Sequence, residues 1–218
     1  MGAVALGFTH IIDHFTWSIL MFLKLGNLAF ILVLFTSFSI LLLRSWRINV
    51  ITLAIQYLGI FFLVAINWPL SMAIVKLVVG WMICAILGTT CMTIKNLDET
   101  EDRKLLSSYF FRGFGGLLII LSIFTLIPQV QSIFPPKIPQ PIIKASVMLI
   151  GIGLLQLGMT SKPFYVVIGL LTILSGFEIL HSALEISSLL AGLLAGVNMG
   201  LALVGAYFLI KENNEVST

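Results

Sequence analysis

Charged residues are scarce in this chain. Only 10% of its 218 residues are Asp, Glu, Lys or Arg, 59% are hydrophobic, and the mean hydropathy is +1.12. A soluble domain carries about a quarter charged residues. The composition therefore excludes a large water-exposed domain and predicts a polytopic protein of the lipid bilayer. The net charge of +3 is too small for a nucleic-acid-binding surface, so no nucleic-acid partner is expected.

Cysteine is almost absent as well. Cys84 and Cys91 lie in one apolar segment, roughly 10 Å apart along a helix axis, which is too far for a disulfide within that helix. The sequence has no Cys-x-x-Cys motif and no Cys/His cluster, so no metal site and no cofactor are expected. It also offers no nucleophile–base pair, nucleotide-binding loop or acid pair for hydrolysis. The sequence thus gives the chain no catalytic site of its own.

Long apolar runs are abundant instead. A membrane-spanning helix needs about 20 mostly apolar residues, and seven such runs are separated by polar or proline-containing breaks. The sequence therefore predicts an all-α bundle of about seven transmembrane helices. The predicted spans are 25–43, 49–66, 70–92, 111–130, 142–160, 163–181 and 186–210.

The region before the first span has a polar helix face. His10, Asp13 and His14 share this face, which we interpret as that of an amphipathic interfacial helix; a metal site would need a further ligand. The charged stretch after the third span is expected to lead through a short surface helix, DRKLLSSYFFRGF, into the fourth span. The regions are an N-terminal segment 1–24, helices 1–3 in 25–92, a charged cytoplasmic loop 93–110, helices 4–7 in 111–210, and a cytoplasmic tail 211–218.

Lysine and arginine are distributed unevenly between the two sides of the predicted bundle. With the N-terminus outside, eight of them fall on the inner side and three on the outer side, so the positive-inside rule predicts an N-out, C-in orientation. The order span, basic loop, span, span occurs in both 25–92 and 142–210, which suggests a parallel repeat. The inner residues are Arg44, Arg47, Lys95, Arg103, Lys104, Arg112, Lys162 and Lys211.

Three ionisable residues interrupt one of the most apolar stretches, LSGFEILHSALEIS at 174–187: Glu178, His181 and Glu185. Their i, i+3 and i+7 spacing predicts one shared helix face. A charge at the bilayer centre costs about 2.5–3.5 kcal/mol on insertion scales, so ionisable residues in a span usually face protein or water. One interpretation is a path for protons along this face. The other is a solvated helix end with an internal salt bridge, in which Glu185 already belongs to the turn. The first is favoured for Glu178 and the second for His181.

A lone lysine, Lys76, lies about two turns after Pro69 in the apolar segment SMAIVKLVVGWMICAIL. Two interpretations are equally open. Its side chain snorkels to the membrane interface, or it is buried and either titrates or pairs with a carboxylate on another helix or subunit.

Uncharged polar residues and glycines within the spans predict helix packing. Gln56 and Gln156, and less clearly Asn198, are expected to hold helices together through amide hydrogen bonds. The GxxxGxxxG pattern of Gly192, Gly196 and Gly200 is expected to let a neighbouring helix approach closely.

Three stretches carry a family resemblance: NLAFILVLFTSFSILLLRSWRINVITLAIQYL, AIVKLVVGWMICAIL and GIGLLQLGMTSKPFYVVIGLLTILSGFEIL. The first resembles a hairpin with a basic turn and a helix glutamine (Gln56), the second a helix with an intramembrane lysine (Lys76), and the third a hairpin with a glycine and a carboxylate. Together, over about residues 27–210, they resemble the component E subunits of hydrogenase-4 and formate-hydrogenlyase-type complexes. The last three helices of that family are related to subunit K of respiratory complex I.

The chain departs from this family at several positions. The proline that usually follows the family's lysine is missing, and Ser175 stands where the family has its helix carboxylate, with Glu178 one turn later on the same face. Glu185 matches a glutamate before the last helix, but Ala191 replaces the aspartate expected after it. The scaffold of the family is thus matched better than its charged set.

The resemblance implies a non-catalytic membrane subunit of a multisubunit, ion-translocating redox complex in a bacterial or archaeal cytoplasmic membrane. Its partners would be antiporter-like subunits and quinone- or hydrogenase-module subunits. Glu178 and Lys76, with Glu185 and His181 as further candidates, would be links in a polar axis that moves protons or sodium. Two alternatives are a structural or assembly subunit, in which polar residues only hold helices together, and an independent small transporter with a midplane site.

Overall fold

Seven helices make up the described part of the chain. The computed structural model describes residues 24–94, 106–135, 138–185 and 187–216, and within these ranges every regular element is a helix. Each contains 19–26 consecutive residues with hydropathy of 1.7–2.3, so each is long and apolar enough to cross a bilayer. The helices are a first helix Lys24–Leu42, α2 (Trp46–Ala65), α3 (Leu70–Thr93), α4 (Leu106–Ile133), α5 (Gln140–Gly158), α6 (Pro163–Leu184) and α7 (Ser188–Val216).

The predicted all-α bundle with seven spans is therefore confirmed, and most helix ends lie within a few residues of their predicted positions. The exceptions are α4, which begins at Leu106 rather than at residue 111, and α7, which ends at Val216 rather than at residue 210 and so includes residues 211–216 of the predicted tail. The surface helix expected before the fourth span is, from Leu106 on, the first turns of α4 itself. The predicted interfacial helix and metal interpretation at 1–23, and the charged loop at 95–105, lie outside the described residues.

Prolines and short polar turns separate the helices. Pro69, Pro139 and Lys162 directly precede α3, α5 and α6 in extended or similar non-helical conformations. Proline is tolerated at the start of a helix, where its missing N–H group would have no intrahelical acceptor. The breaks recognised in the sequence thus become the turns between the helices.

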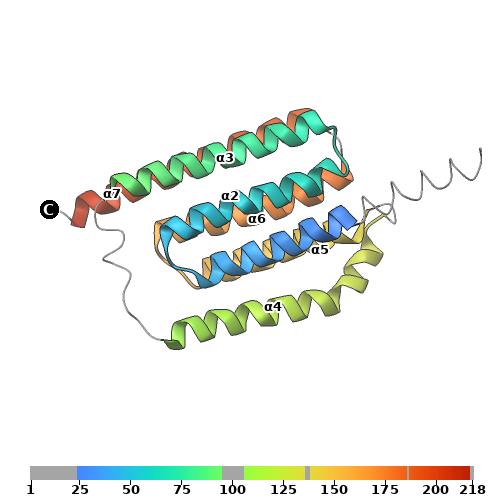
Figure 1. Cartoon of the computed structure of the whole chain (residues 1–218), viewed down its shortest axis with the longest axis horizontal. Helices are drawn as coiled ribbons and strands as arrows, with labels where there is room; N and C mark the ends of the chain where they lie inside the picture. The colour runs from blue at the N-terminus through green and yellow to red at the C-terminus, as the bar shows by residue number, and fades with distance from the viewer. Residues whose placement is uncertain (1–23, 95–105, 136–137, 186, 217–218) are drawn as a thin grey trace, which may run out of the picture.

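The helices form two stacked rows, which can be followed in Figure 1. The first helix, α2 and α3 make one row, and α5, α6 and α7 make the other, with α2 packed on α6 and α3 packed on α7. Paired helices run in the same direction, because Tyr165 at the start of α6 bonds to Arg44 just before α2, whereas His181 near the end of α6 packs against Trp68 just after α2. The arrangement agrees with the parallel repeat suggested by the sequence.

Helix α4 lies at one edge of the two rows and connects them. It packs on the first helix and on α5, where Leu41, Ile123, Ile127, Met148 and Ile152 form a small buried cluster. The larger core lies between the rows, and α6 is the most enclosed helix, followed by α5 and α2. This central position is what buries the polar residues of α6.

Candidate functional site

The candidate site is an ion pair between Lys76 of α3 and Glu178 of α6. The ammonium of Lys76 contacts the Oε1 atom of Glu178. Lys76 is 8% exposed and Glu178 only 2%. The lysine is therefore buried and paired with a carboxylate on another helix, and the alternative that it snorkels to the interface is wrong.

Asn198 of α7 completes the site. Its Nδ2 atom donates a hydrogen bond of 2.7 Å to Glu178 Oε1, the same oxygen that Lys76 contacts. Asn198 is 2% exposed. One carboxylate oxygen thus joins three helices, α3, α6 and α7, by contacts to a cation and to an amide. Hydrogen bonds to an ionised acceptor are stronger than neutral ones.

Both side chains of the pair are buried inside the bundle, so neither charge would be stable there without the other. Transferring one charged side chain to the centre of a bilayer costs about 2.5–3.5 kcal/mol on insertion scales. Breaking a buried pair by removing one partner typically costs about 3–5 kcal/mol because the other charge stays buried. The arrangement can therefore hold a proton on the lysine, and both groups become neutral if that proton moves to the carboxylate.

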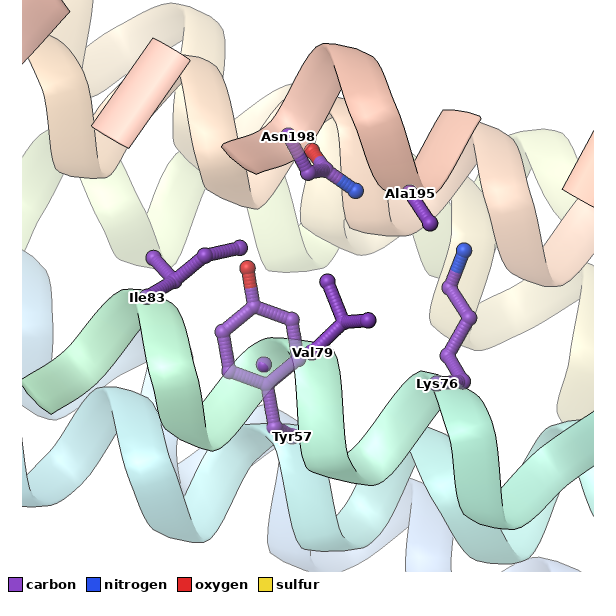
Figure 2. A pocket seen from close by; sticks show the side chains of 7 residues that line it. Tyr57, Lys76, Val79, Ile83, Ala195 and Asn198 are labelled. Carbon is purple, nitrogen blue, oxygen red and sulfur yellow. The ribbon is translucent and has the colours of Figure 1, made fainter. Parts of the chain in front are cut away.

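A small cavity lies beside the pair, between α2, α3 and α7 (Figure 2). It has a volume of about 10 Å³ and is lined by Tyr57, Lys76, Val79, Gly80, Ile83, Ala195 and Asn198. Figure 2 shows the side chains of Lys76 and Tyr57 pointing from their helices toward α7. A cavity of this size accommodates about one water molecule.

Several buried polar atoms around this cavity have no hydrogen-bond partner among the described residues. They belong to both rows of helices and lie close to the pair, and buried groups of this kind usually bond to protein or to ordered water. Tyr57 is near Ser175 of α6, yet the two hydroxyl groups form no hydrogen bond of normal geometry. The orphaned atoms are Glu178 Oε2, Asn198 Oδ1, Ser175 Oγ and the Tyr57 hydroxyl.

His181 lies one turn beyond Glu178, toward the end of α6. It is 8% exposed, its ring stacks on Phe177 at 6.3 Å between centroids, and it meets Trp68 edge-on at 6.4 Å. Its Nε2 atom has no partner in the described part of the chain. His181 thus shares the buried face with Glu178 but packs mainly through its aromatic ring.

Glu185 does not continue this face. It follows the last helical residue of α6 in an extended conformation, and its side chain is exposed. The stripe of three ionisable residues predicted from the i, i+3, i+7 spacing is therefore limited to Glu178 and His181. The alternative in which Glu185 belongs to the turn is confirmed.

The three amide residues have different roles. Gln156 donates from Nε2 to the carbonyl of Tyr165 at 3.0 Å, which joins the end of α5 to the start of α6 as predicted. Asn198 also joins helices, but as part of the charged site rather than as packing alone. Gln56 is completely buried, yet neither atom of its amide group has a partner among the described residues. The predicted hydrogen-bonding role of Gln56 is not seen.

The glycine pattern of α7 does not serve helix packing within the described structure. A Cβ atom at Gly192, Gly196 or Gly200 would have no neighbour within 4 Å. Close helix approach occurs instead between α5 and α6, where a Cβ at Gly153 would lie 2.9 Å from the carbonyl oxygen of Gly169. The glycine pattern of α7 therefore faces away from the bundle, because the buried side of α7 carries Asn198 and small alanines.

Tyr57 was missed by sequence reasoning. Its ring fits against Gly80, which follows Lys76 by one helical turn and is on the same face of α3. A tyrosine in the middle of a span, together with a glycine one turn from an intramembrane lysine, was the available signal. Neither feature is informative until the packing of α2 on α3 is known.

No protein-family model matches this chain, and comparisons with curated proteins and with solved structures find no significant match either. Among the described residues, no group of three or more His, Cys, Asp and Glu side chains could hold a metal ion.

Proposed function

We propose that this chain is a non-catalytic integral membrane subunit of a multisubunit, ion-translocating redox complex, and that the Lys76–Glu178 pair is a link in the ion path of that complex. The observation that carries the proposal is the pair itself, which joins two membrane-spanning helices at a buried position. Ionisable residues at such positions usually mark ion or proton pathways because their burial is costly. The family resemblance stays a hypothesis and supplies the kind of complex.

The chemistry proposed for the pair is a proton shift driven by a neighbouring charge. With Lys76 protonated and Glu178 ionised, the pair is neutral as a whole but strongly dipolar. A charge that appears on an adjacent subunit favours either this state or the state in which the proton has moved from Nζ to the carboxylate. Lys76 is then an amine and Glu178 a carboxylic acid, and the number of protons is unchanged. In the ion-pair state, Oε2 of Glu178, which has no hydrogen-bond partner among the described residues, is the atom that accepts a further proton. Glu178 is then neutral, and the pair carries the single positive charge of Lys76.

The residues around the pair suggest how an ion reaches it. His181 lies about 4.5 Å along the helix axis from Glu178, on the side of the α2–α3 turn, and its Nε2 atom has no hydrogen-bond partner among the described residues. On the opposite side, the one-water cavity and the Tyr57 hydroxyl adjoin Lys76. We propose that ions approach the pair from the outer surface past His181. They continue inward through the cavity beside Tyr57. Glu185 lies beyond the helix end and serves at most as a surface group of this approach.

Partners and orientation belong to the same proposal. Antiporter-like subunits and a quinone- or hydrogenase-side module are the expected neighbours, in a bacterial or archaeal cytoplasmic membrane. The N-out, C-in orientation rests on the excess of Lys and Arg at one side.

The first test is native purification of the protein from its own host in a mild detergent, with mass spectrometry of the proteins that travel with it. We expect antiporter-like and redox-module subunits in one stable band. A lone monomer or homo-oligomer would set the family resemblance aside.

The second test separates the ion path from assembly. Glu178→Gln keeps the size of the side chain and its hydrogen bond from Asn198 but leaves Lys76 buried without its carboxylate, which destabilises the chain. At a temperature at which the variant complex still assembles, we expect ion pumping reduced at least tenfold. Lys144→Gln, in which a half-buried lysine of α5 loses its charge, is the matched control. Wild-type pumping in an assembled Glu178→Gln complex would contradict a role of Glu178 in the ion path.

A structural or assembly subunit is the second candidate. It is favoured by one observation: a single oxygen of Glu178 joins α3, α6 and α7. Polar contacts of this kind hold helices together in membranes without any ion path. In that case, neutral variants of Lys76 and Glu178 weaken assembly and leave the activity of the assembled complex intact. The other alternative, an independent small transporter, needs a binding site at the midplane. The cavity beside the pair has room for about one water.

A further inference from the structure

Arginines gather at the end of the bundle opposite His181, where the turn before α2, the turn between α5 and α6, and the first turns of α4 come together. Helix α4 fits closely there: a Cβ at Gly113 would lie 3.5 Å from Leu42 of the first helix, and one at Gly115 would lie 3.3 Å from Leu155 of α5. Because these glycines let α4 approach its two neighbours, Arg112 lies within this junction.

Arg112 is buried at the junction, with only 5% of its surface exposed. Its guanidinium donates a hydrogen bond of 3.1 Å to the carbonyl of Met159, at the C-terminal end of α5. The last carbonyl groups of a helix lack intrahelical donors and carry partial negative charge. Met159 therefore anchors one edge of the guanidinium, but a neutral carbonyl does not balance its full charge.

Arg44 reaches the same turn from the other row of helices. Its guanidinium lies 5.3 Å from the centre of the Tyr165 ring, and its backbone carbonyl accepts a hydrogen bond from the Tyr165 hydroxyl. Arg112 and Arg44 thus contact opposite sides of the turn between α5 and α6, Arg112 at Met159 and Arg44 at Tyr165. Two like charges are thus held near each other by contacts to neutral groups.

No carboxylate of the described residues forms a salt bridge with Arg44 or Arg112. Of the carboxylates whose side chains the structure describes, Glu178 pairs with Lys76, Glu185 lies at the other end of α6, and Glu212 is exposed near the end of α7. Two guanidinium groups at the same turn attract an anion, and arginine forks match the oxygen atoms of a phosphate.

The position along the bundle identifies the source of that phosphate. Arg44 directly precedes α2, whose 20 residues extend about 30 Å, so the arginine lies at the level of the lipid headgroups if α2 crosses the bilayer. Beside Arg112, the side chains of Phe110, Phe111 and Phe114 are 61–74% exposed on α4. They offer acyl chains an apolar surface directly next to the two charges.

We propose that Arg44 and Arg112 bind the phosphate of an anionic phospholipid, whose acyl chains pack along the exposed phenylalanines of α4. Clusters of arginine between helices at a membrane surface are suited to such headgroups. This inference does not rest on the proposed function, since it uses neither the Lys76–Glu178 pair nor a partner subunit. The bound lipid would hold α4 against these two turns, one from each row of helices.

The test uses the purified full chain in detergent, with native mass spectrometry and thermal unfolding at increasing phosphatidylglycerol, phosphatidylcholine or inorganic phosphate. We expect phosphatidylglycerol to bind more tightly than phosphatidylcholine and to raise the unfolding temperature. Its affinity should fall roughly fivefold in Arg44→Gln and in Arg112→Gln. Lys144→Gln should leave it unchanged. Arg44 is half exposed, so Arg44→Gln remains informative even if Arg112→Gln fails to fold.

Two results would overturn the proposal. The first is equal affinity for the two lipids in the wild type. If a preference for phosphatidylglycerol then appears when Asp98, Glu99, Glu101 and Asp102 are neutralised, these carboxylates are the counterions of the arginines. The second is equal protection by inorganic phosphate, which assigns the site to a free anion.

Discussion

Tyr57 of α2 lies directly against Gly80 of α3, so closely that a Cβ atom on Gly80 would stand 2.4 Å from Cγ of the tyrosine ring. This contact aims the tyrosine side chain at the cavity beside Lys76. Glycine is required at position 80 because a larger residue and the ring cannot occupy the same space.

Replacement of Gly80 by alanine should therefore displace the ring of Tyr57. We expect Gly80→Ala to destabilise the fold by about 1–3 kcal/mol, as overpacked cores do, measured by thermal or denaturant unfolding in detergent. Gly88→Ala, on the same helix, is the control because its Cβ would meet only Val50, at an ordinary 3.6 Å. Equal stability of the two variants would contradict the close contact.

Removal of one member of the ion pair should be more harmful than removal of both. Lys76→Met leaves the Glu178 carboxylate buried without its cation and should cost about 3–5 kcal/mol. The double variant Lys76→Met/Glu178→Met should recover most of this loss, because two apolar side chains of similar size replace two charges. Unfolding of both variants and of Glu178→Met completes a double-mutant cycle. A double variant as unstable as the sum of the single ones would show that the residues do not interact.

The two buried glutamines should respond in opposite ways to leucine. Gln156→Leu removes the donor to the Tyr165 carbonyl and should cost about 1–3 kcal/mol. Gln56→Leu removes an amide without partners among the described residues and should leave stability unchanged or raise it. Each variant is the control for the other in the same unfolding experiment. A clear loss of stability in Gln56→Leu would instead indicate a bonded amide, for example one that holds a buried water.

Two glycines with opposite surroundings test the packing of α5 and α7. Gly153→Ala should destabilise the chain by about 1–3 kcal/mol, since its Cβ would lie 2.6 Å from Ile173 and 2.9 Å from the carbonyl oxygen of Gly169. Gly196→Ala should be neutral or favourable by about 1 kcal/mol, because the position is open and alanine is the better helix former. The isolated chain in detergent is the sample, with unfolding temperature as the readout. Destabilisation by Gly196→Ala would mean that another helix covers this face.

The C-terminal end of α6 could not be predicted from the sequence. Spacing alone put Glu178, His181 and Glu185 on one face, which holds only while the helix continues. The helix ends at Leu184, and helix ends are poorly marked where no glycine or proline follows. For the same reason the exposed position of Glu185 could be offered only as an alternative.

Lys76 shows a different limit. Its two interpretations, snorkelling or pairing, depend on whether a carboxylate on another helix lies at the same depth and faces it. The depth of a residue in the membrane can be counted along its helix from the sequence. Which side chain it faces depends on how α3 packs against α6 and α7. The same limit applies to the amides. Gln56, which was expected to bond to another helix, has no partner among the described residues, whereas Asn198, which was expected to matter less, bonds to Glu178.

The sequence by itself determined the class of this protein: seven long apolar runs can satisfy their backbone hydrogen bonds in a membrane only as helices, and prolines and polar turns separate them. It also singled out the ionisable residues, since charges among apolar residues are conspicuous. Only the tertiary structure decided which of them meet. The stacking of two rows of three helices brings Lys76, Glu178 and Asn198 together from three helices far apart in the chain, because side-chain contacts depend on helix rotation and neighbour order, which local patterns do not encode.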